Sequence, residues 1–354
     1  MIDWFTRRIL DGIVRLTGLD VPMGRTSLIT PLIAILVYSG GCYQIPDGGT
    51  LEGGPEKPEE KPIGLSLRLT TDDLPAGRKG LTFLVSPFLG SDAAGPQYEA
   101  LGSYLEGTLG VPIQFEVGAS YRNVIERVAS SKFDIAILPP ASYALAKEKN
   151  TSLQLLASQL AYGATSYSSY IFVRSDDKAR TLKDIVGRRM AFVDEHSTSG
   201  YFLPYAAFLR EGIDPEKAFD KIVFSRDHTS AVRDLVEGRV DAAATASGML
   251  DATRNAATGK KRFDRGSIRI LYKAGRIPYD ALVANPALPK TGAKKLAWAF
   301  ISLSTRTAEG REVYAATEEI SGWRSAKDTD YDGVRRILAQ VRTHLSESKG
   351  TGAK

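Results

Sequence analysis

Short apolar runs alternate with amphipathic segments along most of the chain, from Leu81 to Leu345. The apolar runs have the length of buried strands, and the segments between them place apolar residues three and four positions apart, as helices do. Strands are predicted at 81–85, 112–117, 133–138, 153–157, 167–173, 190–193, 222–224, 240–244, 268–272 and 281–284. Helices are predicted at 98–109, 120–128, 141–147, 182–186, 202–209, 231–237, 293–303, 309–316 and 331–345. This alternation predicts an α/β fold of mostly parallel sheets with helices on both faces.

The N-terminal part of the chain has a different pattern. An apolar run at 28–37 is too short to span a bilayer, and it is followed by Ser-Gly-Gly at 39–41 and then by Cys42. This layout is typical of a secretory signal, and small residues directly before one cysteine resemble a bacterial lipobox, in which the cysteine is acylated. Ser39 departs from the lipobox pattern, because a leucine usually stands three places before the cysteine. The alternative is a buried or stray cysteine.

The two ends of the chain are therefore set apart from its globular part. We predict a signal and lipobox region at 1–41, with Met23 as an alternative start, and a lipid anchor at Cys42 that holds the protein to a membrane in the periplasm or at the cell surface. Residues 42–79 are rich in Gly, Pro, Glu and Lys and contain too little apolar surface to offset the entropy of ordering, so a flexible tether is predicted. A disordered tail is predicted at 346–354.

Composition narrows the class of protein. At 354 residues, 43% hydrophobic and 25% charged, the chain is long enough for two domains or lobes of a soluble globular protein. Lys and Arg number 46 against 41 Asp and Glu, but the charges are scattered, without the dense basic runs of nucleic-acid binders. The single cysteine excludes an intrachain disulfide.

A hydroxyl-rich turn, Ser-Thr-Ser-Gly at 197–200, joins the strand predicted at 190–193 to the helix at 202–209. The first N–H groups of a helix have no partner within the helix and carry the positive end of its dipole, so hydroxyls placed there offer donors to an anion of phosphate shape. The alternative is an ordinary N-cap, since Ser and Thr favour that position without any ligand. Pro204 predicts a kink or a loosened first turn in this helix.

A second helix start carries comparable groups. His228 and two hydroxyl residues lie between the strand at 222–224 and the helix at 231–237. Tyr121 and Ser142 also follow predicted strands. Ligands of open α/β sheets bind at the carboxyl ends of strands, so these groups are predicted to face one anion together with the turn at 197–200.

These motifs together resemble the PhnD-like phosphate, phosphite and phosphonate substrate-binding proteins of bacterial ABC importers. The resemblance is carried by Tyr121 in a Ser-Tyr-Arg helix start, Pro-Pro-Ala-Ser-Tyr at 139–143, Tyr167 before an apolar strand, Ser-Thr-Ser-Gly at 197–200, His228 and Val-Asp at 240–241. It implies a type II periplasmic-binding-protein fold, in which two lobes close on the ligand. By this resemblance, lobe one is expected at 80–170 and 276–345, and lobe two at 171–275.

The resemblance also implies roles for single residues. Ser197, Thr198 and Ser199 would bind the phosphoryl oxygens with backbone N–H groups, and His228 would add a charge-assisted bond from the same lobe. Tyr121 and Tyr167 would come from the other lobe and the hinge side. The full set of predicted ligand residues is Tyr121, Ser142, Tyr167, Ser197, Thr198, Ser199, Gly200, His228 and Asp280.

One departure bears on the ligand. Members of the family that take aminoalkylphosphonates place a carboxylate shortly after the Val-Asp strand, whereas Thr-Ala-Ser-Gly-Met at 245–249 offers none. A buried ammonium without a counter-charge is costly. The sequence therefore favours phosphate, phosphite or a small uncharged phosphonate.

The function predicted on these grounds is capture of a phosphorus oxyanion by a monomeric lipoprotein that delivers it to an ABC permease. A ligand-sensing lipoprotein of the same fold is one alternative. An enzyme that acts on a phosphorylated substrate is another, although the sequence has no nucleophile elbow, Walker loop or metal-spaced His and Cys cluster. No catalytic residue, metal or cofactor is predicted, and no nucleic-acid partner.

Overall fold

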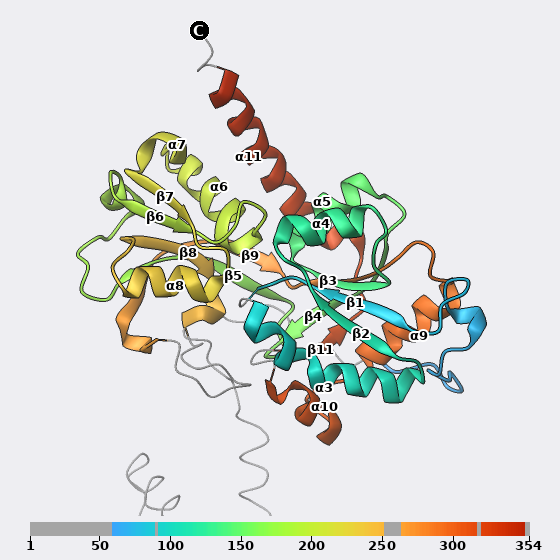
Figure 1. Ribbon diagram of the computed structural model, residues 1–354. Helices are drawn as coiled ribbons and strands as arrows, with labels where there is room; N and C mark the ends of the chain where they lie inside the picture. The colour runs from blue at the N-terminus through green and yellow to red at the C-terminus, as the bar shows by residue number, and fades with distance from the viewer. Residues whose placement is uncertain (1–58, 89–90, 251–262, 317–319, 351–354) are drawn as a thin grey trace, which may run out of the picture. The chain divides into compact units, whose positions relative to one another are not determined.

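The computed structural model describes residues 59–88, 91–250, 263–316 and 320–350 (Figure 1). The chain divides into two units, Met1–Gly54 and Pro55–Lys354, and all described residues belong to the second. The predicted signal region at 1–41 and the anchor at Cys42 lie outside the described residues. Within the described ranges, no helix combines the length and the apolar character needed to cross a membrane.

The strands of the described residues form two sheets (Figure 1). The six-stranded sheet has the order β11-β4-β10-β3-β1-β2, and the five-stranded sheet has the order β7-β6-β8-β5-β9. The first contains β1 Leu81–Val85, β2 Ile113–Val117, β3 Ile135–Leu138, β4 Gln154–Ala161, β10 Ala281–Ala284 and β11 Ile320–Arg324. The second contains β5 Ser166–Arg174, β6 Arg189–Phe192, β7 Lys221–Phe224, β8 Ala242–Ala246 and β9 Ile268–Pro278.

The α/β class is confirmed, but the sheets are mixed rather than mostly parallel. Strand β1 pairs in parallel with β2 and β3, and β6 pairs in parallel with β7 and β8. Strand β10 runs antiparallel to β3 and β4, and β5 runs antiparallel to β8 and β9. The expectation failed because hydrophobic periodicity identifies a strand without giving its direction.

Two connections carry the chain between the sheets. The first, at 162–165, joins β4 to β5, and the second, at 279–280, joins β9 back to β10. The predicted lobe boundaries, after residues 170 and 275, lie inside β5 and β9 instead. Both connections belong to the region where Tyr167 and Asp280 were predicted to bind ligand.

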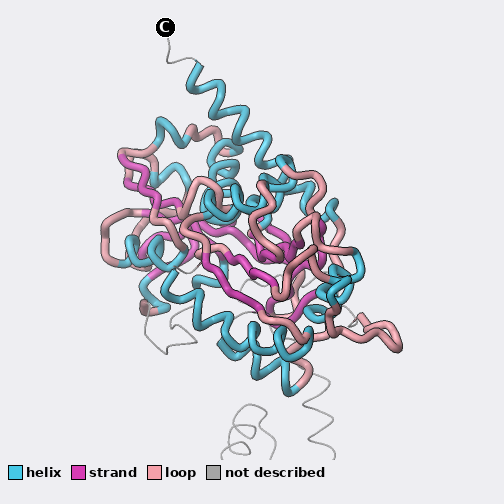
Figure 2. Tube along the Cα trace, turned by 45° about the vertical axis from the view of Figure 1, so that its right-hand side comes forward, coloured by secondary structure: helices cyan, strands magenta, loops and turns pink. Residues whose placement is uncertain are grey.

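The helices surround the strands of the two sheets (Figure 2). The α-helices are α3 Ser91–Leu109, α4 Tyr121–Ala129, α5 Pro140–Lys149, α6 Leu203–Arg210, α7 Pro215–Ala218, α8 His228–Val236, α9 Lys290–Ile301, α10 Ala308–Val313 and α11 Asp332–Gly350. One π-helical turn, η3 Thr198–Phe202, precedes α6. Short 3₁₀ turns are η1 Thr71–Asp73, η2 Leu182–Ile185, η4 Ser247–Leu250, η5 Arg265–Ser267, η6 Tyr314–Ala316 and η7 Asp328–Tyr331.

Alternate side chains of β1 are buried in two different hydrophobic clusters. Phe83 packs into a cluster that contains residues of α3 and α9, and its ring makes an edge contact with Phe300 at 5.8 Å between centroids. Leu84 belongs to the other cluster, with Val124 of α4 and Tyr143 of α5. Successive strand side chains point to opposite faces, so α4 and α5 cover the face of β1 opposite to α3 and α9.

The predicted disordered tail from Ser346 is helical as far as Gly350, because α11 continues to that residue. The apolar residues Val334, Leu338 and Val341 of this helix are buried in the core shared with α5 and α6 (Figure 1). These residues hold the earlier turns of α11 in place, and the helix then continues through exposed residues such as Ser346 and Glu347 (Figure 1). Residues 351–354 lie outside the described part of the chain.

The tether prediction is wrong for its last part. Leu69 and Leu74 are buried against the α3 and α9 core, and the Leu69 N–H donates to the Leu109 carbonyl at 2.8 Å. Asp73 is buried and accepts from Lys295 Nζ at 2.6 Å. A flexible segment was expected because local composition is polar, but two leucines and one ion pair fasten it to the globular part.

The pKa of Asp73 reflects this contact. Burial by itself would raise the pKa, but hydrogen bonds from Lys295 and from the Thr70 backbone and side chain bring it well below its ordinary value. A carboxyl with a depressed pKa in the folded state stabilises the fold above its unfolded-state pKa of about 4, and this contribution is lost as the pH falls below that value.

We predict that Asp73→Ala lowers the free energy of unfolding by about 3 kcal/mol at pH 7, because Lys295 is left without its buried partner. Urea unfolding of the purified protein measures the difference. Asp72→Ala, at an exposed neighbouring carboxylate, is the matched control and should change stability by less than about 0.5 kcal/mol. Equal stability of the two variants at pH 7 would show that the Asp73 contact is not stabilising.

Candidate functional site

The predicted ligand residues lie where strands end and helices begin. Tyr121 begins α4 after β2, and Ser142 lies in the first turn of α5 after β3. The turn at 197–200 follows β6, and His228 begins α8 after β7. All of these strands belong to parallel pairs, so their carboxyl ends meet at one edge of each sheet, the edge at which ligands of such sheets bind.

The central turn owes its shape to a proline and a glycine. Pro204 has no N–H to donate to the Gly200 carbonyl one turn back, and that carbonyl instead accepts from the Val193 N–H at 3.1 Å. The predicted loosening at Pro204 is observed as the π-helical turn η3. A Cβ atom at position 200 would lie 2.4 Å from Val193 Cγ2, so only glycine permits this close approach.

Ser197 does act as an N-cap, because its Oγ accepts from the Gly200 N–H at 3.0 Å. Thr198 Oγ1 accepts a hydrogen bond from the Ala141 N–H at 2.8 Å. This bond joins the turn that follows β6 of the five-stranded sheet to the start of α5, which follows β3 of the six-stranded sheet. Both side chains are fully buried. A hydroxyl that accepts one hydrogen bond keeps its own proton, so each can still donate to an anion. The N-cap and ligand interpretations are therefore compatible.

The backbone of the turn has a further support. Ser169 of β5 donates its Oγ–H to the Ser199 carbonyl at 2.7 Å. Both residues are buried. The turn is thus fixed from β5, from the start of α5 and from within itself, which holds its free N–H groups and hydroxyl protons in one arrangement.

His228 is buried and neutral. Its Nδ1 is within hydrogen-bond distance of Thr245 Oγ1, and the Ala246 N–H donates to the same nitrogen at 3.4 Å. Because a backbone amide can only donate, Nδ1 is the acceptor and the proton is on Nε2. Burial lowers the pKa of the ring to about 3. The ring thus offers one neutral N–H donor, and the charge-assisted bond predicted for His228 would take its charge from an anionic ligand.

Four buried hydroxyls lack a hydrogen-bond partner in the part of the chain that the structure describes. They are Ser86 Oγ, Tyr121 Oη, Ser142 Oγ and Thr229 Oγ1. A buried polar group without a partner costs roughly 1–3 kcal/mol, and such groups are rare in native proteins. Their occurrence at the ends of β1, β2, β3 and β7 indicates that something other than the protein satisfies them.

The sequence singled out Tyr121 and Ser142, included Thr229 only as one of two hydroxyl residues beside His228, and gave no role to Ser86. A signal for Ser86 was present, since it directly follows the strand at 81–85, in the position that Ser142 and Tyr121 occupy near their own strands. Thr229 stands next to His228 at the start of α8. Serine and threonine are common at such positions, so only burial without a partner sets these two apart.

Contacts between the two sheets bring the helix starts together. Tyr121 packs with Val193 and Ala231 in a small apolar cluster that joins α4 to the end of β6 and to α8. The Phe88 carbonyl accepts from the His228 N–H at 3.2 Å, and the two rings lie 4.4 Å apart between centroids. These contacts bring the start of α4, the end of β6, the start of α8 and the loop after β1 together between the sheets.

Tyr167 and Asp280 belong to the same place. Burial raises the pKa of the Tyr121 hydroxyl well above its ordinary value, and the nearby Asp194, Asp280 and Tyr167 raise it further, so the hydroxyl stays protonated. The Tyr167 ring stacks on Tyr279 at 5.0 Å between centroids. Burial raises the pKa of the Asp280 carboxyl to about 7, although part of its surface remains accessible. The structure thus gathers the predicted ligand residues in one region.

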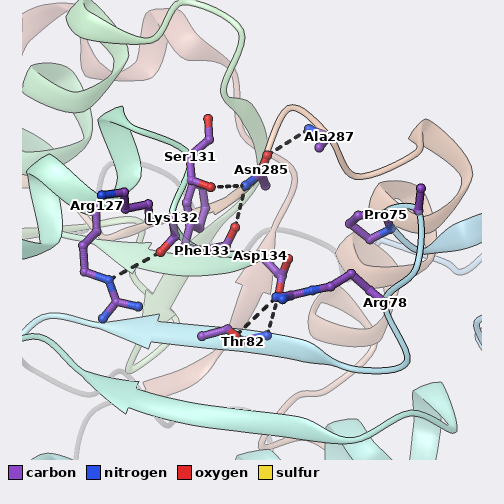
Figure 3. Close-up of a pocket in the computed structure, with 11 residues that line it drawn as sticks. Pro75, Arg78, Thr82, Arg127, Ser131, Lys132, Phe133, Asp134, Asn285 and Ala287 are labelled. Atoms are coloured by element: carbon purple, nitrogen blue, oxygen red, sulfur yellow. Dashed lines mark hydrogen bonds and ion pairs between the residues drawn. The ribbon is translucent and has the colours of Figure 1, made fainter.

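A pocket elsewhere on the first sheet is not this region. It lies at the amino ends of β1 and β3 (Figure 3). Its volume is about 390 Å³, and none of the predicted ligand residues lines it. Asp134 accepts from Arg78 and from the Thr82 N–H, and Arg127 is paired with Glu116. Asp134 thus joins the start of β3 to the start of β1, and the pair of Arg127 and Glu116 joins α4 to β2.

Comparison with known proteins assigns the family. Residues 83–331 match the model described as "ABC transporter, phosphonate, periplasmic substrate-binding protein". The phosphate-import protein PhnD of Mycolicibacterium smegmatis is 27% identical over 274 residues, which cover 73% of this chain and 84% of that protein.

Solved structures show the same fold. A binding-protein component of an ABC phosphonate transporter from Pseudomonas aeruginosa superposes with a TM-score of 0.67 at 21% identity, over 77% of this chain and 88% of that chain. PhnD1 from Prochlorococcus marinus, solved in complex with methylphosphonate, superposes with a TM-score of 0.65 at 17% identity, over 75% of this chain and 98% of that chain. The two-lobed type II binding-protein fold that the resemblance implied is thereby confirmed.

The matched segment spans both sheets and contains every residue of the site between them. The chain belongs to the family of periplasmic substrate-binding proteins of phosphonate ABC transporters.

Proposed function

We propose that this chain binds a phosphorus oxyanion (phosphate, phosphite or a small phosphonate) between its two sheets and delivers it to an ABC permease without catalysing a reaction. The observation that carries the proposal is the set of buried hydroxyls without a partner at the ends of β1, β2, β3 and β7. A tetrahedral oxyanion offers several acceptor oxygens within one small volume, and it would satisfy donors that come from several directions.

The donors of the site suit such an ion. The turn at 197–200 offers N–H groups and hydroxyl protons at a helix start, where an anion is favoured. His228 offers its Nε2–H, and Tyr121 offers a protonated phenol. Hydrogen bonds to a charged group contribute about 1.5–3 kcal/mol each against a cost of roughly 4–15 kcal/mol for lost rigid-body freedom. Several such bonds support affinity in the micromolar range or tighter.

Asp280 adds selectivity. Within the described residues its carboxyl has no hydrogen bond, and its raised pKa of about 7 reflects burial. An ionised Asp280 accepts a hydrogen bond from a P–OH group, which monoprotonated phosphate and phosphite carry and sulfate lacks at neutral pH. A site built to bind a hydroxyl discriminates strongly against an analogue without it.

The proposed oligomeric state and cellular location follow from the same family and from the N-terminal sequence. The chain acts as a monomer outside the cytoplasm, and acyl chains on Cys42 hold it to the membrane that contains the permease. The lipobox-like sequence before Cys42 supports the anchor. The other groups of the candidate site are mainly neutral hydroxyls and N–H donors, which suit binding of an anion. In the described ranges, no cluster of three His, Cys, Asp or Glu side chains is placed to hold a metal.

The proposal predicts that the purified protein binds a phosphorus oxyanion and that Ser197→Ala with Thr198→Ala weakens this binding at least ten-fold. Thermal shift and calorimetry with phosphate, phosphite, methylphosphonate, 2-aminoethylphosphonate and sulfate measure both, because a ligand of the folded state raises its stability by mass action. The amine-bearing ligand and sulfate should bind much more weakly. Absence of binding by all five compounds would refute the proposed ligand class.

The matched control for this double variant is Thr307→Ala. Thr307 caps α10 as Ser197 caps the turn, because its Oγ1 accepts from the Gly310 N–H at 3.0 Å. Loss of such a cap costs about 1 kcal/mol in either case. Thr307→Ala should therefore lower the melting temperature and leave ligand affinity unchanged. If Thr307→Ala and the double variant lost the same affinity, general destabilisation of the fold, and not the loss of a ligand contact, would explain the weaker binding.

The neutral His228 predicts a pH dependence of stability. Its folded-state pKa of about 3 lies below the unfolded value of about 6.5, so the unfolded chain binds a proton that the folded chain does not. Stability from this group is complete above pH 6.5 and falls by about 2 kcal/mol at pH 5. Urea unfolding of wild type and His228→Gln at pH 7 and pH 5 measures it. Identical pH dependence in both proteins would contradict the neutral, buried ring.

The anchor is tested in cells. Cys42→Ser should release the mature protein from the membrane fraction, and wild-type processing should be blocked by an inhibitor of lipoprotein signal peptidase, because one acylated cysteine provides the attachment. Fractionation and immunoblotting measure both outcomes. A Cys42→Ser protein that remains in the membrane fraction would refute the anchor.

A further inference from the structure

Ser86 lies at the carboxyl end of β1, in the first sheet. It directly follows β1, which lies between β3 and β2 in the sheet. Val85, the last residue of β1, pairs with Val117 of β2 and with Ile137 of β3. The chain beyond β2 leads to Tyr121, and the chain beyond β3 leads to Ser142. Ser86 therefore lies between the elements that carry these two hydroxyls.

The alternation of β1 indicates the face to which Ser86 belongs. Phe83 and Val85 are buried in the cluster with α3 and α9, whereas Leu84 is buried in the cluster with α4 and α5. Side chains two positions apart on an extended chain share a face, so Ser86 belongs with Leu84. This is the face covered by the helices that begin near Tyr121 and Ser142. Ser86 is 7% exposed, and its Oγ has no partner among the described residues.

The loop after Ser86 also meets the second sheet. Phe88, two residues on, contacts His228 through its carbonyl and its ring. The second sheet thus supplies the donors of His228 and of the turn at 197–200, while the first supplies three hydroxyls without partners. A tetrahedral ligand whose oxygens bind the second sheet's donors presents its remaining substituent to the first sheet.

We propose that Ser86, with Tyr121 and Ser142, binds the fourth substituent of the ligand and makes the site selective for the four-oxygen ion, inorganic phosphate. This inference rests on the proposed function. An oxygen in the fourth position accepts hydrogen bonds from these hydroxyls. The hydrogen of phosphite or the methyl group of methylphosphonate would leave them buried and unpaired, which a polar site penalises strongly.

Calorimetric titration of wild type and Ser86→Ala with phosphate, phosphite and methylphosphonate tests the inference. Wild type should bind phosphate at least ten-fold more tightly than methylphosphonate. Ser86→Ala should lose about ten-fold in phosphate affinity and less than about two-fold in methylphosphonate affinity. Because the substitution removes a buried hydroxyl without a partner, the melting temperature of the variant without ligand should be unchanged or higher.

Ser225→Ala is the matched control. Ser225 is 8% exposed and also follows a strand, but its Oγ donates to Asp234 at 2.6 Å. This variant should show a lower melting temperature with unchanged affinities, the opposite of the Ser86 result. The inference is overturned if Ser86→Ala weakens all three ligands equally, weakens none, or if wild type prefers methylphosphonate. If the wild-type protein binds none of the three ligands, the proposed function itself is refuted, and with it the role of Ser86.

Discussion

The site depends on one constraint, that a hydroxyl removed from water needs a hydrogen-bond partner. Ser86, Tyr121, Ser142 and Thr229 break this rule within the described residues. They follow four strands, and contacts of Tyr121 and Phe88 join the two sheets near these strand ends. The loss amounts to roughly 1–3 kcal/mol for each group. Under the proposed function, an anion that supplies the missing acceptors would recover this loss on binding.

The backbone around the site follows from local chemistry. The missing N–H of Pro204 leaves the Gly200 carbonyl to the Val193 N–H, and the absent side chain of Gly200 permits that approach. The resulting turn is held by Ala141 of the other sheet through Thr198. The same few residues thus shape the candidate turn and join the two sheets.

Much of the fold could be predicted from the sequence because local pattern determines it. Apolar periodicity located most of the elements, although β11 and α7 were not predicted, and the hydroxyl turn indicated the candidate site. The remaining features depend on contacts between distant parts of the chain. The pair of Asp73 and Lys295 fastens a segment with the composition of a tether, and the burial that makes His228 neutral comes from packing against other elements. Ser86 resembles any serine after a strand until its burial is known.

The central claim is that a phosphorus oxyanion satisfies these hydroxyls. The most direct measurement is a crystal structure of the protein grown with phosphate. The account predicts a tetrahedral ligand with oxygens within hydrogen-bond distance of Ser86, Tyr121 and Ser142 on one side, and of His228 Nε2 and the turn at 197–200 on the other. Phosphate bound elsewhere, with these hydroxyls paired to ordered water, would contradict it.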